Sequence, residues 1–253
     1  MTTDMRRFGE TTAIGACTPQ PALDYYLIFP ETPGDDPSAQ PDGIAVEEFM
    51  LADDHTATGL NNAAWTSADG GWWSSAAFGR GMRSDPELRA RIVAVQRRDA
   101  EIVYRRLGAG ELPDETTLRT YFHDCQPLTG SAPLRLSPPE VPEGFHDKRV
   151  YRILFANELG KDGLAYLQRV WQMTLADDFA DPRARVVGTA RLRVAHDLFT
   201  WDLRRIGPGV AWCLDLTACL GDRSRDITRP LLRELTTVMR FEGLIPVTIE
   251  RFA

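Results

Sequence analysis

The chain has 253 residues, of which 43% are apolar and 26% are charged, a composition typical of globular proteins. Its formal charge of −7 disfavours nucleic acids and anionic membranes as partners, because binding to either depends on clustered cationic side chains. A chain of this length can bury a sizeable core without disulfides or structural metals.

The first ten residues are polar and lack the apolar core of a signal peptide, so we expect a soluble, cytoplasmic protein. Four cysteines without a CxxC pair are typical of reduced thiols, which agrees with that location. Lysine occurs only twice, so arginine supplies nearly all of the positive charge. Together with abundant alanine, glycine and proline, this bias indicates a bacterial genome of high GC content.

Residues 1–126 predict an N-terminal α/β sub-domain. The turn formers and acids of Glu31–Gly43 predict a loop with little to bury. Apolar runs, several of them rich in aromatic or β-branched residues, predict strands at Ala13–Cys17, Asp24–Phe29, Ile44–Leu51 and Thr117–His123.

The segment Ala52–Met82 is dense in small residues and yet carries several large aromatic ones, so it predicts a tryptophan- and glycine-rich loop. Large rings on a backbone of small residues suit a surface that contacts a ligand or a partner, although such rings more often pin a loop to the core. Adjacent side chains of an extended segment point to opposite sides, so we expect one of two neighbouring tryptophans to be partly exposed. The candidate binding residues are Trp65, Trp72, Trp73 and Phe78.

Helix signals begin at Ser84, which can cap the helix, while Glu87 completes a capping box and Pro86 is tolerated in the first turn. Apolar side chains then recur at helical spacing up to Leu107, and Gly108 follows as a terminator. This pattern predicts one continuous helix.

Prolines are concentrated in the middle of the chain, where Pro127–Gly144 holds five prolines and two glycines. This composition predicts a linker over residues 127–148. It would join the N-terminal sub-domain to a C-terminal α+β sub-domain of residues 149–253.

The C-terminal sub-domain predicts the element order β-α-β-β-β-α-β, so we expect an α+β fold with packed helices and a mainly antiparallel sheet. Turn residues between the three consecutive strands favour a meander. Strict alternation in the third of these strands predicts that Trp212, Leu214 and Leu216 face the following helix. The elements are Tyr151–Phe155, Leu159–Phe179, Arg185–Val194, Leu198–Ile206, Val210–Leu220, Ile227–Phe241 and Pro246–Phe252.

No motif in the chain identifies a reaction. Each of the four histidines adjoins an aspartate, which is material for a general base or a metal site. Their spacing fits no zinc motif, however, and we expect no bound metal. Cys125 is a conceivable thiolate nucleophile, although cysteine is more often a small buried apolar residue. The sequence has no GxSxG, GxGxxG or GxxxxGK[ST] motif.

A candidate anion site lies at Leu220–Ile227, where a strand leads through Gly221, Arg223 and Arg225 into the start of a helix. Backbone N–H groups at a helix start attract anions, and arginine binds phosphate through two hydrogen bonds. Alternatively, the same segment is only a capped helix start, and its aspartates would repel a phosphate.

The element order over Val150–Phe252 resembles the first part of the N-acetyltransferase (GNAT-like) fold, and Val187-Gly188-Thr189 resembles that family's second strand. In that fold a loop at the Leu220–Ile227 position holds the pyrophosphate of coenzyme A. The resemblance therefore implies coenzyme A as a cofactor and acyl transfer as the activity. Asp222, Ser224, Arg225 and Asp226 stand where the family has glycines.

Three functional classes follow from these observations. The acidity, the lack of catalytic motifs and the aromatic segment favour a binding or interaction protein, such as an accessory protein of a biosynthetic cluster or an immunity-type protein. A coenzyme A-dependent acyltransferase is the second class. Another small-molecule enzyme, such as a cyclase or a hydrolase, is the third. The partner of the first class would be a protein or a small molecule, and coenzyme A is expected only under the second.

Overall fold

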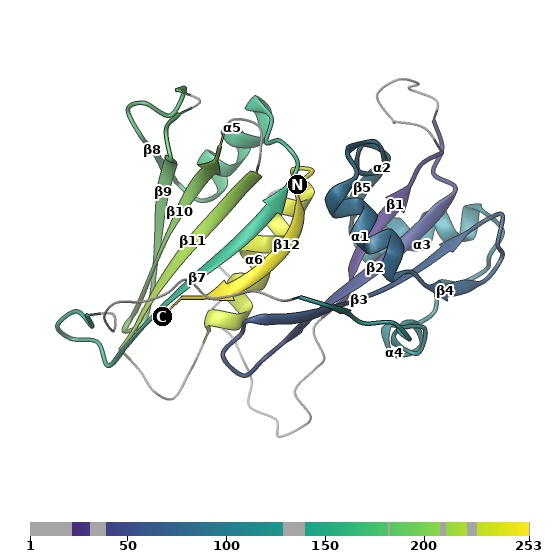
Figure 1. Cartoon of the computed structure of the whole chain (residues 1–253), viewed down its shortest axis with the longest axis horizontal. Helices are drawn as coiled ribbons and strands as arrows, with labels where there is room; N and C mark the ends of the chain where they lie inside the picture. The colour runs from purple at the N-terminus through teal and green to yellow at the C-terminus, as the bar shows by residue number, and fades with distance from the viewer. Residues whose placement is uncertain are drawn as a thin grey trace.

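The computed structural model describes residues 22–30, 39–128, 140–181, 183–207, 211–221 and 227–252. Two six-stranded sheets, in which every strand pair is antiparallel, lie side by side with helices packed on them (Figure 1). The α+β class predicted from the sequence is confirmed.

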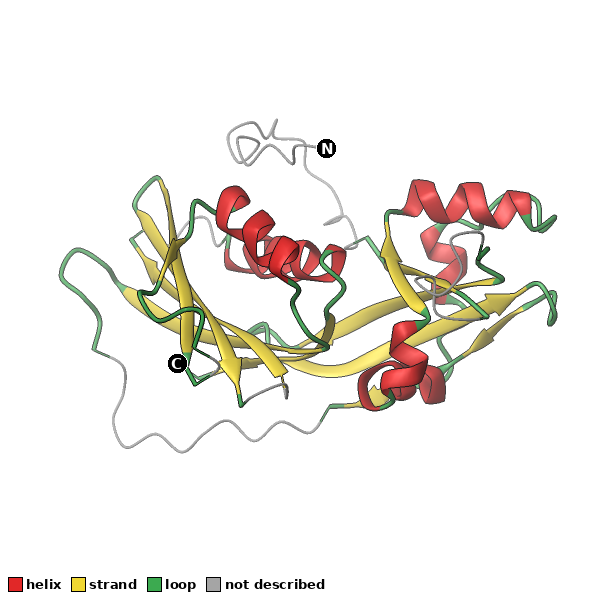
Figure 2. Ribbon diagram, turned by 90° about the horizontal axis from the view of Figure 1, so that it is seen from above, coloured by secondary structure: helices red, strands yellow, loops and turns green. Residues whose placement is uncertain are grey.

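The first sheet has the strand order β4-β3-β2-β1-β5, with β6 also pairing with β3. Helices cover both of its faces, as Figure 2 shows: α1 and α2 pack on one face, and α3 and α4 on the other. The strands are β1 (Asp24–Ile28), β2 (Gly43–Leu51), β3 (Ala57–Thr66), β4 (Trp72–Ser74), β5 (Ile92–Val95) and β6 (Gln126–Pro127). The helices are α1 (Ala76–Ser84), α2 (Pro86–Ala90), α3 (Arg97–Arg106) and α4 (Glu115–Arg119).

The second sheet has the strand order β12-β7-β11-β10-β9-β8. Its strands are β7 (Asp147–Ala156), β8 (Thr174–Leu175), β9 (Val186–Val194), β10 (Asp197–Ile206), β11 (Ala211–Leu220) and β12 (Ile245–Arg251). Helices α5 (Lys161–Val170) and α6 (Thr228–Phe241) lie on the same face of this sheet (Figures 1 and 2). Antiparallel pairing of β9 with β10 and of β10 with β11 confirms the predicted meander.

The predicted alternation of β11 is also confirmed. Trp212, Leu214 and Leu216 are buried, and they belong to one core cluster with Leu231, Leu235 and Val238 of α6. The opposite face of the sheet is charged in part: Asp215 forms ion pairs with Arg152 at 2.6 Å and with Arg204 at 2.9 Å.

The two sheets share a core. The hairpin of β2 and β3 reaches the second sheet, where Ala57 joins the same cluster as Tyr151, and Phe49 and Leu51 pack against that cluster. At the hairpin turn, the backbone N–H of Arg251 donates to the hydroxyl of Thr56 at 3.3 Å. The two halves of the chain are therefore packed against each other through apolar side chains.

The prediction of a loop over Ala52–Met82 is wrong, because most of this segment forms β3, β4 and α1. Both faces of β3 are covered, and the neighbouring side chains Ala63 and Ala64 are fully buried in different clusters. At Gly59 an added Cβ would lie 2.6 Å from Cys125 Sγ. Small residues here allow close packing of a central strand and do not mark an irregular loop.

The single helix predicted from Ser84 to Leu107 is also wrong, since β5 separates α2 from α3. The β-branched residues of Ile92–Val95 pair with β1 and complete the sheet, and this pairing overrides the helical spacing. The cap of α2 is Asp85, whose carboxylate accepts from Glu87 N at 2.9 Å.

Two further predicted elements differ. Thr117–His123 is not a strand, because Asp114 caps the short helix α4 by accepting from Thr117 N at 2.7 Å. The helix predicted over Leu159–Phe179 ends at Val170. Beyond it Gln172 has a left-handed φ of 48°, and β8 pairs with β9.

Parts of other predictions lie outside the described residues. These are the strand Ala13–Cys17, residues 31–38 of the Glu31–Gly43 loop, and residues 129–139 of the 127–148 linker.

Candidate functional site

The neighbouring tryptophans of β4 lie on opposite faces of the first sheet, as period-two alternation requires. Trp72 packs on the α3 and α4 face, where its indole N–H donates to Tyr104 Oη at 3.3 Å. Trp73 packs on the α1 face together with Phe78. Neither indole is fully buried.

Trp65 is a core residue, with only 3% of its surface exposed. It pairs with Trp72 in the register of β3 and β4 and meets the ring of Tyr104 edge-on, with 4.8 Å between ring centres. Its side chain therefore offers no contact surface to a partner, and its contribution is to packing.

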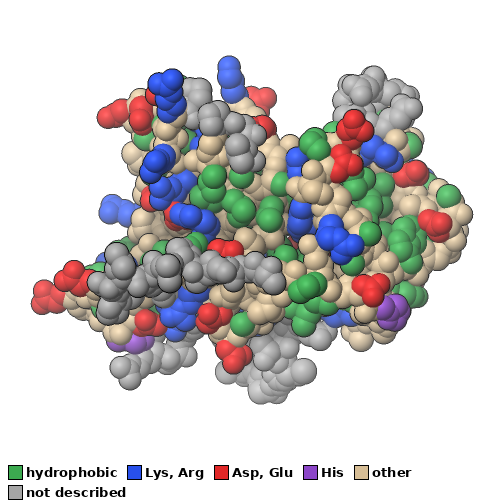
Figure 3. Space-filling model, in the orientation of Figure 1, with side chains coloured by type: hydrophobic (Ala, Val, Ile, Leu, Met, Phe, Trp, Pro, Cys, Tyr) green, Lys and Arg blue, Asp and Glu red, His purple; other side chains and the backbone are tan. Residues whose placement is uncertain are grey.

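Trp73 and Phe78 wall an open pocket of about 610 Å³ beside β4. Exposed hydrophobic side chains lie on this half of the molecule between α1 and β4 (Figure 3). The pocket combines two aromatic rings, small side chains and a few polar groups. Its lining residues are Trp73, Ser74, Ser75, Ala76, Ala77, Phe78, Arg80, Asp124 and Cys125.

Side-chain hydrogen bonds hold the wall of this pocket in place. The Ser74 hydroxyl accepts from the backbone N–H of Asp124 at 3.1 Å, which fixes the chain before β6 against β4. The Ser75 hydroxyl bonds to the side-chain carbonyl of Asn62 in β3. A wall held by such contacts is largely formed before any ligand arrives.

A buried ion pair stands behind that wall. Asn62 Nδ2 donates to Glu47 Oε1 at 2.6 Å, and Arg83 forms two hydrogen bonds to the same carboxylate, at 2.9 and 3.0 Å. Arg83 Nε also donates to the carbonyl of Pro246 in β12 at 2.9 Å. The pocket wall is therefore connected through hydrogen bonds to the second sheet.

Cys125, the candidate nucleophile, lies in the pocket lining and is exposed. Its Sγ lies 3.3 Å from the thioether sulfur of Met50, which is not a base.

Of the histidines, His55 and His196 occupy turns, whereas His123 and His146 precede β6 and β7. Among the residues that the structure describes, no group of three or more His, Cys, Asp and Glu side chains is placed to hold a metal ion.

Of the candidate anion-binding residues, only Gly221 is described, and Arg223 and Arg225 lie outside the described residues. The backbone N–H of Gly221 donates to Asp197 Oδ1 at 2.8 Å. An added Cβ at Gly221 would lie 2.5 Å from the carbonyl oxygen of His196, so close backbone packing explains this glycine. This segment connects β11 to α6, and β12 is the next strand in the chain. In the sheet β7 lies between β11 and β12, so these two strands are not neighbours.

Three charged residues with buried side chains, Glu47, Arg83 and Arg240, are not among the residues predicted from the sequence. The sequence indicates the burial of two of them, because Glu47 interrupts an apolar strand and Arg240 lies on the apolar side of a helix. Charged residues at such positions are buried only when they are paired.

In the described part of the chain, no helix is long and apolar enough to cross a membrane. Comparison of the chain with protein-family models, with characterised proteins and with solved structures gives no match.

Proposed function

We propose that the protein is a soluble, cytoplasmic, non-catalytic interaction protein that receives an apolar side chain of a partner polypeptide between Trp73 and Phe78. The observation that carries this proposal is that both rings line the same open pocket and neither is fully buried. Aromatic side chains give a large contact area with little loss of conformational entropy, and they are enriched among the residues that dominate binding energy.

The polar groups of the pocket support this proposal. Arg80 and Asp124 lie beside the two rings and supply charged groups of opposite sign, which can orient the backbone of a bound partner. The net charge of −7 favours a basic partner, because complementary charge increases the rate of association. An accessory protein of a biosynthetic cluster and an immunity-type protein both fit this description.

A small-molecule binding protein is the second candidate, and the size of the pocket supports it. Sites for small molecules typically enclose about 300–1,000 Å³ and combine apolar walls with a few polar groups. The pocket of about 610 Å³ beside β4 has this composition.

The test compares affinity purification from the native cells by the wild type, by Trp73→Ala and by Phe179→Ala. Phe179 is a matched control, because it is 36% exposed and belongs to the other half of the chain. We expect one protein to be retained by the wild type and the control and lost with Trp73→Ala, and its direct binding to be confirmed by calorimetry. Equal retention by all three forms would contradict the proposal. Binding only of aromatic fragments in ligand-observed NMR would select the second candidate.

A further inference from the structure

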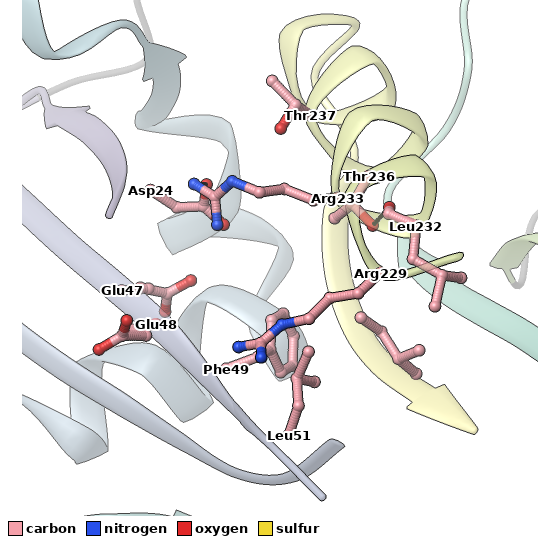
Figure 4. Close-up of a pocket in the computed structure, with 11 residues that line it drawn as sticks. Asp24, Glu47, Glu48, Phe49, Leu51, Arg229, Leu232, Arg233, Thr236 and Thr237 are labelled. Atoms are coloured by element: carbon pink, nitrogen blue, oxygen red, sulfur yellow. Dashed lines mark hydrogen bonds and ion pairs between the residues drawn. The ribbon is translucent and has the colours of Figure 1, made fainter. Parts of the chain in front are cut away.

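A second, smaller pocket lies between the two sheets and measures about 60 Å³ (Figure 4). Strands β1 and β2 form one side of it, and α6 forms the other. A cavity needs about 10–15 Å³ to hold one water molecule, so this pocket admits a group of only a few heavy atoms. Its apolar surface is formed by Phe49, Leu51, Leu232 and Ile249.

The carboxylates that line this pocket are already neutralised. Each of the three pairs with a different arginine outside the lining, and Arg119 also pairs with Glu115 at 3.9 Å. The ion pairs are Asp24 with Arg240 at 2.8 Å, Glu47 with Arg83 at 2.9 Å and Glu48 with Arg119 at 2.8 Å.

The lining has two further charges, and both are positive. Arg229 and Arg233 extend from α6 toward β1 and β2, as Figure 4 shows. Arg233 bonds to the carbonyl of Ala22 and lies 3.7 Å from Asp24, which already pairs with Arg240. Within the described residues, Arg229 has no ion pair. The charge left over in the lining is therefore positive, although the whole chain carries −7.

We propose that this pocket binds a short aliphatic monocarboxylate. The carboxylate pairs with Arg229, whose planar guanidinium matches it through two hydrogen bonds, while Arg233 adds positive charge. The aliphatic tail lies on Phe49 and Leu51, which are the partly exposed apolar residues of the lining, and leaves water. The pocket volume of about 60 Å³ limits the tail to a few carbon atoms.

The ligand would contact both halves of the chain, because α6 packs on the second sheet and β2 is a strand of the first. A molecule that binds only when the two sheets are docked stabilises the docked state and raises its melting temperature. This site is separate from the Trp73 pocket and does not depend on the proposed interaction function.

The experiment titrates the full-length protein with butanoate and with butylamine, which has the same carbon skeleton and the opposite charge. Binding is measured by ligand-observed NMR and by calorimetry, up to about 10 mM ligand, which covers millimolar affinity. We expect the carboxylate to bind and the amine not to bind. Absence of carboxylate binding in this range, or equal binding of the amine, would overturn the proposal.

Variants identify the site. Arg229→Gln should weaken carboxylate binding about two- to fivefold, because Arg229 is exposed and exposed ion pairs are weak. Arg191→Gln, at an exposed position of β9, is the matched control and should bind as the wild type does. Trp73→Ala should also leave carboxylate binding unchanged. An equal dissociation constant for Arg229→Gln and the wild type would show that the carboxylate does not use this pocket.

Discussion

Arg240 of α6 donates a hydrogen bond from Nε to the hydroxyl of Tyr26 in β1 at 2.8 Å, and its guanidinium carbon lies 4.5 Å from the centre of the Tyr26 ring. Arg240 is only 2% exposed and also pairs with Asp24 at 2.8 Å. Burial acts to lower the pKa of Arg240, but Asp24 and Tyr26 more than offset this effect and the net pKa is raised. The guanidinium thus stays charged, and its partners belong to the other half of the chain.

Arg240→Ala should lower the free energy of unfolding by about 3–5 kcal/mol, because the substitution leaves the partners of a buried charge uncompensated. Equilibrium denaturation in urea measures the loss. Arg233→Ala is the control: its side chain is 39% exposed and lies 3.7 Å from the same aspartate, so a loss below about 1 kcal/mol is expected. Similar losses for the two variants would show that the buried pair does not hold the halves together.

Leu214→Ala should destabilise the protein by about 2–5 kcal/mol, since the Leu214 side chain is fully buried in the core between the second sheet and its helices. Thr217 is a partly exposed residue of β11 on the face opposite the core. Thr217→Ala should therefore change stability by less than about 0.5 kcal/mol. Thermal and urea unfolding of both variants measure this difference. If the losses are equal, the assignment of the core face is wrong.

The five long strands of the second sheet could be predicted from the sequence because they are amphipathic and are separated by clear turn residues. The two-residue strand β8, in contrast, lies inside the segment predicted as a helix. The alternation of β11 alone was enough to place Trp212, Leu214 and Leu216 on the core face. The first sheet could not be predicted to the same extent. Ile92–Val95 is a short β-branched run inside a helical pattern, and only its pairing with β1 decides its structure.

The candidate site was predictable in part for the same reason. Alternation of side chains in an extended segment indicates that Trp72 and Trp73 separate, and it does so without knowledge of the fold. The neighbourhood of Trp73 could not be inferred, because Asp124 reaches Ser74 across 50 residues of sequence. The burial of Glu47 likewise depends on Arg83 in a different element.

Glu234→Gln should stabilise the protein at pH 7 and have little effect at pH 4. Burial raises the pKa of Glu234 above its ordinary value of 4.5, so the folded state favours the protonated carboxyl. The stability contributed by this group is complete below pH 4.5 and is lost as the pH rises through the raised value. Melting temperatures at both pH values measure the effect, with the exposed Glu111→Gln as the control. A gain of the same size at pH 4 would refute this explanation.

Cys213 should resist alkylation in the folded protein, whereas Cys125 should react. Cys213 is buried and Cys125 is exposed. Burial, followed by the charge of Asp215, raises the pKa of Cys213 to about 11, so little thiolate is present at pH 8. Mass spectrometry of iodoacetamide-treated protein in a Cys17→Ser background measures the order of modification. Modification of Cys213 at the rate of Cys125 would show that β11 opens under native conditions.

Trp65→Ala and Trp73→Ala should separate packing from binding. Trp65 is enclosed among the core side chains between β3 and α3, so its truncation should lower the free energy of unfolding by about 3–5 kcal/mol. Trp73 is only partly buried at the edge of the sheet, so Trp73→Ala removes less buried surface and should lower stability by about 1 kcal/mol. The two variants are compared by urea denaturation and, below their unfolding transitions, by calorimetric titration with the partner identified by affinity purification. Because Trp73 lines the pocket and Trp65 does not, only Trp73→Ala should weaken the binding of that partner. Weaker binding by folded Trp65→Ala with unchanged binding by Trp73→Ala would move the interaction surface to the opposite face of the first sheet.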